Sequence, residues 1–121
     1  MIFVDFDIET YTNETLSTLK VPVFNTRADI SEDINTFITF QENKNLDALT
    51  TDNIRRKTKF IMLVKTFSYD DLFDLNRELE IKMQKAGFSR ISKRKTVDIE
   101  LECNMTIYKF EYIAPTIIIE E

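Results

Sequence analysis

The chain has 121 residues, of which 43% are hydrophobic and 31% charged, and its formal net charge is −5. This length suits one domain, residues 1–121, with a substantial core, and the acidic balance disfavours a general electrostatic grip on nucleic acid or anionic lipid. Since the sequence has no histidine and one cysteine, it excludes histidine-based catalysis, the usual zinc sites and an internal disulfide.

The sequence carries no recognisable membrane or export signal. Its apolar runs are short, well below the roughly 20 residues that a membrane-spanning helix needs. The opening MIFVDFDIET lacks the basic region and the long apolar region of a signal peptide. We therefore expect a protein that is made in the cytoplasm and stays out of the membrane.

The start of the chain fits two interpretations. IFVDFDI is apolar like a strand, whereas DIETYTNETLSTL fits a short helix with Ile8, Leu16 and Leu19 facing inward. We favour a helix that ends near Leu19. Residues 21–25, VPVFN, then predict a short strand, in which Pro22 is tolerated near the start or on an edge.

The next segment predicts one clear strand between two polar stretches. Residues 26–33 are charged and rich in capping residues, which indicates a loop. TFITF, residues 36–40, alternates apolar and polar side chains and predicts a second strand. Residues 41–58, QENKNLDALTTDNIRRKT, are polar, and we expect a long connection of the kind that is often functional or mobile.

The strongest prediction is a buried strand followed by a helix. FIMLV, residues 60–64, is a continuous apolar run typical of a central strand. Ser68 is the expected N-cap, and Asp70 and Asp71 place negative charge at the positive end of the helix dipole. Gly87, the one glycine, is expected to end the helix in a left-handed conformation. The apolar stripe consists of Leu72, Leu75, Leu79, Met83 and Ala86.

Two alternating segments, VDIELE and MTIYKFEYI, predict an antiparallel hairpin near the end of the chain. The first places Val97, Ile99 and Leu101 on one face, and the turn is expected between Lys95 and Asn104. Cys103 is interpreted as a small, half-buried apolar residue.

The IIIEE segment after Pro115 is either an added edge strand or a tail, residues 115–121, that becomes ordered on a partner. An unpaired run of Ile117, Ile118 and Ile119 would be adhesive, so we expect it to be covered. Together the elements predict an α+β domain: an antiparallel or mixed sheet of four to five strands with helices packed on one face.

One short motif suggests metal chemistry. FDIET, residues 6–10, resembles the first motif of proofreading 3′–5′ exonuclease domains, in which Asp7 and Glu9 would hold divalent metal ions. That family also needs a tyrosine or histidine four residues before an aspartate, and this sequence has no such pair. We therefore favour an acidic patch or a first helical turn over a metal site.

Other charged clusters have simpler explanations. Asp70, Asp71 and Asp74 fit a helix start better than a calcium site. The basic segments fit solvated faces better than a phosphate site or an acidic partner, although both remain open. They are Arg55, Arg56, Lys57 and Lys59 in IRRKTK, and Arg90, Lys93, Arg94 and Lys95 in SRISKRK.

The order of these elements resembles that of the tail-terminator (tail-completion) proteins of long-tailed bacteriophages and related phage-tail-like particles. Those proteins have an N-terminal helix, a V-P-V-F strand, a short strand with an x-D-N turn, an apolar strand, a helix of about five turns ending in G-F, and a final hairpin. The matching residues here are 21–24, 36–40, 51–53, 87–88 and 107–113.

The resemblance implies a structural virion protein of the tail or neck, without enzymatic activity, cofactor or metal. It would form a hexameric ring that caps the tail tube, ends tube polymerisation and meets the head–tail connector, while DNA passes through an acidic lumen. We expect contacts with the tube or a neighbouring copy at Asp52, Asn53, Arg55, Arg56 and Lys57, and also at Ile117, Ile118 and Ile119.

Three alternatives remain. A head–tail connector or adaptor protein of the same particle would share the fold and differ in its partners. A metal-dependent exonuclease-like protein would use Asp7 and Glu9 with Mg²⁺ or Mn²⁺. A host ligand-binding domain of ferredoxin-like type would be a monomer or dimer.

Overall fold

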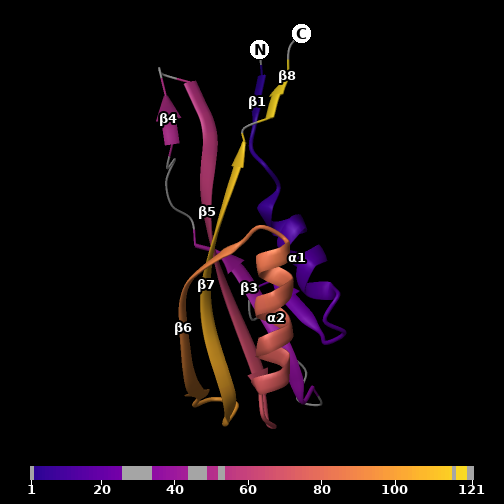
Figure 1. The fold of residues 1–121 in the computed structure, drawn as a ribbon. Helices are drawn as coiled ribbons and strands as arrows, with labels where there is room; N and C mark the ends of the chain where they lie inside the picture. The colour runs from indigo at the N-terminus through magenta and orange to yellow at the C-terminus, as the bar shows by residue number, and fades with distance from the viewer. Residues whose placement is uncertain (1, 26–33, 44–48, 52–53, 116, 120–121) are drawn as a thin grey trace.

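The structure, a computed structural model, describes residues 2–25, 34–43, 49–51, 54–115 and 117–119 (Figure 1). The elements in chain order are β1 (Ile2–Val4), α1 (Ile8–Ser17), β2 (Val23–Asn25), β3 (Thr36–Glu42), β4 (Leu49–Thr51), β5 (Ile54–Ser68), α2 (Phe73–Lys85), β6 (Ser89–Asp98), β7 (Cys103–Pro115) and β8 (Ile117–Ile119). None of the helices described is long and apolar enough to cross a membrane.

The main sheet has the strand order β2-β3-β5-β7-β6, with β4 pairing β5 beside this path. The β2–β3 pair is parallel and the other pairs are antiparallel, so the sheet is mixed. Both helices pack on one face of it, as Figure 1 shows. The predicted α+β class is thereby confirmed, and β5 is the central strand that its apolar run indicated.

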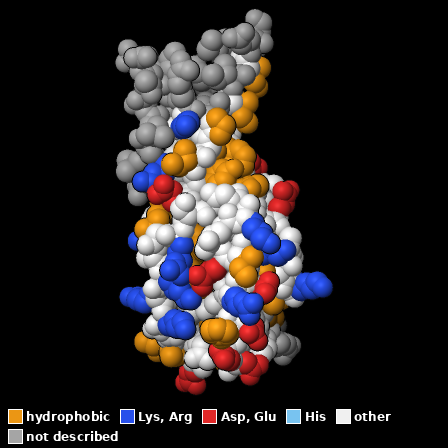
Figure 2. Space-filling model, in the orientation of Figure 1, with side chains coloured by type: hydrophobic (Ala, Val, Ile, Leu, Met, Phe, Trp, Pro, Cys, Tyr) orange, Lys and Arg blue, Asp and Glu red, His pale blue; other side chains and the backbone are white. Residues whose placement is uncertain are grey.

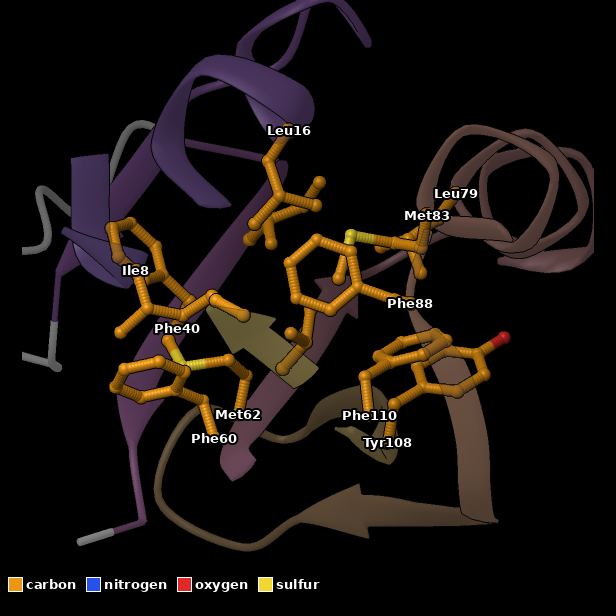
Figure 3. Close-up of a cluster of buried hydrophobic side chains, with 13 residues drawn as sticks. Ile8, Leu16, Phe40, Phe60, Met62, Leu79, Met83, Phe88, Tyr108 and Phe110 are labelled. Atoms are coloured by element: carbon orange, nitrogen blue, oxygen red, sulfur yellow. The ribbon is translucent and has the colours of Figure 1, made fainter. Parts of the chain in front are cut away.

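The main core lies between the helices and one face of β3, β5 and β7 (Figure 3). Alternate residues of β5, such as Met62 and Val64, point to this face, where Leu79 and Met83 of α2 meet them. Tyr108 and Phe110 are fully buried there. The stripe predicted for α2 is therefore the face that packs on the sheet.

A smaller apolar cluster lies on the opposite face of the sheet. Phe37 of β3 and Phe67 of β5 stack with their ring centroids 4.5 Å apart, and Cys103 is buried beside them. Cys103 is thus the small apolar residue that the sequence indicated, more deeply buried than expected.

The prediction of a long connection at residues 41–58 was wrong. Residues 41 and 42 complete β3, and β4 and the start of β5 form an antiparallel pair within the same segment. β5 therefore begins at Ile54, well before the apolar run. Its first residues extend beyond the region that the helices cover (Figure 1), and the pairing of β5 with β4 and β7 makes this segment a strand although it carries no apolar run.

The predicted N-cap of α2 was also wrong. Ser68 is the last residue of β5, and its hydroxyl accepts from the amide of Asp70. The helix begins at Phe73, whose amide donates to Asp71 at 2.9 Å. With 13 residues, α2 is also shorter than the about five turns that the resemblance implies.

The helix stop was predicted correctly. Gly87 has φ of 99°, and an added Cβ would lie 3.1 Å from the ring of Tyr112. The amide of Phe88 donates to the carbonyl of Met83, which closes the helix end. Phe88 then enters the core, where the aromatic rings of Tyr11 and Tyr112 contact it.

The final hairpin is formed by β6 and β7, and its turn lies within the predicted interval. The alternation of VDIELE does not continue as a strand, because Ile99 falls in the turn and is 89% exposed. Glu102 adopts φ of 53°, the conformation that glycine usually supplies. Asp98 accepts from the amide of Leu101 and so stabilises the turn.

The sequence left a choice between a strand and a helix at the start of the chain, and the structure contains both. Residues 2–4 form β1, and a helix follows that ends at Ser17, near the expected Leu19. Ile8 and Leu16 face the core as expected. β2 is shorter than predicted, and Pro22 lies just before this edge strand, where no ladder amide is lost.

Candidate interaction surfaces

One end of the molecule extends beyond the helices, and we call it the projecting end: β1, β4, β8, residues 54–59 of β5 and residues 113–115 of β7 (Figure 1). Lys57 lies opposite Pro115 in the β5–β7 register, two residues before β8. The fold therefore places Arg55, Arg56 and Lys57 at the same end of the molecule as Ile117, Ile118 and Ile119 (Figure 1).

Four apolar side chains share one face of the β1–β8 ribbon. The register pairs Ile2 with Ile119 and Val4 with Ile117, and alternate residues of paired strands point to the same side. These side chains are between 39% and 46% exposed. Figure 2 shows hydrophobic side chains along this edge of the projecting end.

The isoleucine run is therefore paired, although the side chains of Ile117 and Ile119 are not covered as expected. β8 pairs with β1 and not with an edge of the main sheet. Within the part of the chain that the structure describes, Ile117 and Ile119 remain exposed. Ile118 lies opposite Phe3 in the register.

The structure describes some of the other predicted interface residues but not all of them. Asp52 and Asn53 lie outside the described residues. Arg55 and Arg56 belong to β5, at the level of its pairing with β4. Lys57 is exposed on the same strand.

The exonuclease-like carboxylates do not lie on one strand face, because they begin α1. Asp7 is the N-cap, and it accepts from the amide and the hydroxyl of Thr10 at 3.1 and 2.7 Å. These hydrogen bonds lower the pKa of the Asp7 carboxyl. Glu9, in the first turn, accepts from Asn25 at 3.3 Å. Among the described residues, no three acidic or cysteine side chains form a metal-binding group.

Sequence reasoning missed a groove between α2 and β6, which we call the α2–β6 groove. Its volume is about 290 Å³. Phe73 and Ile81 stand on its helix wall, 61% and 38% exposed. The complete lining is Phe73, Asn76, Arg77, Glu80, Ile81, Lys93 and Lys95. The four-residue spacing of Phe73, Arg77 and Ile81 signals a shared helix face, but it lies outside the main apolar stripe.

Glu80 joins the two walls of this groove. It contacts Lys93 at 2.8 Å and Arg90 at 2.6 Å, and it accepts from the buried hydroxyl of Tyr108 at 2.8 Å. Burial alone would raise the pKa of Glu80, but the hydrogen bonds from Lys93 and Tyr108 and the charges of Lys93 and Arg90 lower it. Burial and the Glu80 carboxylate raise the pKa of Tyr108. Part of the basic segment in β6 is therefore structural.

A buried amide forms the floor of the groove. Asn76 of α2 is 2% exposed, accepts from the hydroxyl of Thr66 at 2.7 Å and donates to that of Thr106 at 2.9 Å. These bonds hold the first half of α2 against β5 and β7, which fixes Phe73 and Arg77 beside β6.

Comparison with models of known protein families gives no match, and neither does comparison with curated protein sequences.

Proposed function

We propose that this protein is a structural component of a phage-type tail that forms a closed ring on the end of the tail tube. The ring ends tube polymerisation and provides the surface for the head–tail connector. The observation that carries the proposal is the apolar face of the β1–β8 ribbon at the projecting end, because an exposed apolar patch marks a surface for contact with another protein.

The order of elements supports the same proposal. Apart from β1, β4 and β8, the elements follow the order that the resemblance to tail-terminator proteins implies. They are a helix, a V-P-V-F strand, a second strand, the central strand, a helix followed by Gly87-Phe88, and a hairpin. In the sequence, the x-D-N motif falls between β4 and β5, and both of these strands reach the projecting end. This end would meet the tube or a neighbouring copy.

The charge of the chain suits a ring through which DNA passes. With a net charge of −5 per copy, the chain gains no general binding free energy from counterion release on DNA. The DNA is therefore not retained in the lumen. Of the basic residues in β6, Arg90 and Lys93 are paired with Glu80.

Tube assembly in the presence of the protein tests this function. Tube protein of the same particle is polymerised with and without the chain, and tube lengths are measured in negative-stain images. A terminator gives short tubes with a ring at one end. Ile117→Asp with Ile119→Asp should restore long tubes, whereas Ile99→Asp, which changes an exposed isoleucine at the opposite end, should not. Unchanged tube lengths with the wild-type protein would contradict the function and favour an adaptor.

A further inference from the structure

We propose that the apolar face of the β1–β8 ribbon of one copy docks into the α2–β6 groove of the next copy. The contact is head-to-tail, between two different surfaces of identical chains. This inference rests on the proposed function in one respect, since a closed ring needs a contact that repeats by rotation.

The two surfaces have complementary chemistry. The ribbon offers Ile117 and Ile119, and the sequence continues with Glu120 and Glu121. The groove offers an apolar wall with Phe73 and Ile81. Isoleucines against the apolar wall and glutamates against the basic residues would satisfy both parts of the groove together.

The basic residues of the groove are not all neutralised within the chain. Lys93 is paired with Glu80, but Arg77 and Lys95 form no ion pair with any residue that the structure describes. Three cations and one carboxylate therefore line the groove. In a chain of net charge −5, this local excess of positive charge favours an acidic segment as the occupant.

The two surfaces cannot meet within one copy. Figure 1 places the ribbon beyond the C-terminal end of α2, whereas the groove begins at Phe73, the first residue of that helix. The ribbon of one chain therefore needs a second chain, and each copy would have one surface left for the next. The exposed edge strand β6 borders the groove, so the docking segment can also add main-chain hydrogen bonds to that edge.

Cross-linking between two variants tests this contact directly. Ile119→Cys protein is mixed with Ile81→Cys protein and treated with a short bis-maleimide. The expected product is a covalent dimer of one copy of each. Ile99→Cys replaces Ile81→Cys in the matched control, since Ile99 is 89% exposed and lies outside the groove. Wild-type protein controls for Cys103, which is 3% exposed.

A complementation experiment tests the direction of the contact. Ile119→Asp and Ile81→Asp should each weaken self-association at least about tenfold, because each places a charge in an apolar contact. Mixed, the two variants retain one intact ribbon and one intact groove, so they should form a heterodimer and nothing larger. A symmetric contact would give no such rescue.

The outcomes separate this inference from the proposed function. A cross-link as frequent with Ile99→Cys as with Ile81→Cys, or no cross-link at all, overturns the contact. Binding of duplex DNA that Lys95→Glu abolishes, without a cross-link, overturns it in favour of a phosphate ligand. If the protein shortens tubes but fails to cross-link, the function stands and the contact falls. If a specific cross-link forms but the protein has no effect on tube length, the contact stands and the proposed function falls.

Discussion

The hydroxyl of Tyr108 donates to the carboxylate of Glu80 across 2.8 Å, and so ties the central part of α2 to β7 beneath the groove. Tyr108 is fully buried, and the side chain of Glu80 is 19% exposed. This pair connects the core to the surface that we propose as a docking site, and its titration can be measured.

Glu80→Gln should lower the free energy of unfolding by about 1–2 kcal/mol at neutral pH, since it removes the charge that Lys93 and Arg90 face. The pKa of Glu80 is lowered in the folded state, so its stabilising contribution is complete above the ordinary value of 4.5 and is lost as pH falls through the lowered pKa. The difference between wild type and variant should therefore shrink in acid. Urea unfolding at several pH values checks this, and a constant difference would contradict it.

Tyr108→Phe is the matched variant for the other partner. It should cost about 1 kcal/mol at neutral pH, because one buried hydrogen bond is lost. The raised pKa of Tyr108 gives the wild type a contribution that is complete below the ordinary value of 10.0 and is lost as pH rises toward the folded pKa. The variant should lack this alkaline loss. Equal decline of both proteins above pH 10 would show that Tyr108 is not the group responsible.

Asn76→Ala should be among the more destabilising single changes, at about 2–3 kcal/mol, because it leaves the buried hydroxyls of Thr66 and Thr106 without a partner. Thr66→Val with Thr106→Val in the same protein should recover part of the loss, since it removes the groups left unsatisfied. Denaturant unfolding of the single, double and triple variants measures this coupling. Additive effects would contradict a shared network.

Asp7→Ala should lower the melting temperature, because α1 loses its N-cap. The pKa of Asp7 is lowered in the folded state, so its contribution is present above the ordinary value of 3.8 and disappears in stronger acid. Glu9→Ala is the control, with a smaller expected effect. Melting in the presence of Mn²⁺ separates capping from metal binding: stabilisation by Mn²⁺ that Asp7→Ala abolishes would support the exonuclease-like alternative.

Arg55→Glu with Arg56→Glu should reduce tube capping and leave the monomer folded, because both residues belong to β5 at the projecting end. Tube lengths in negative stain measure capping, and circular dichroism measures folding. Lys82→Glu with Lys85→Glu on α2 is a control of equal charge change, because both residues are exposed and lie outside the α2–β6 groove. Capping as efficient as that of the wild type would show that this part of β5 meets neither the tube nor a neighbour.

The sequence predicted elements best where a core imposed a pattern. The stripe from Leu72 to Ala86 and the stop at Gly87 are local signals, and the structure agrees with both. The prediction failed at the polar start of β5. This segment has no apolar periodicity, so it was expected to be a connection, yet pairing with β4 and β7 makes it a strand. At Ile99 the error is the opposite one. This residue belongs to the alternating VDIELE segment, which predicts a strand, but it lies in the turn between β6 and β7.

The candidate surfaces were only partly predictable. The run at Ile117–Ile119 is visible as an adhesive segment, but its pairing with β1 joins residues from opposite ends of the sequence, which no local pattern can indicate. The α2–β6 groove depends on how closely α2 and β6 approach each other. Its cations and its apolar wall belong to segments whose simplest explanation was a solvated face.

The mass of the protein in solution tests the proposed ring most directly. It is measured by light scattering at two concentrations, with negative-stain images of the same fraction. A closed ring gives a species of six copies of the 14.3 kDa chain, seen as six-fold rings, whose share rises at the higher concentration. A mass of one or two copies at both concentrations, with no rings in the images, would contradict it.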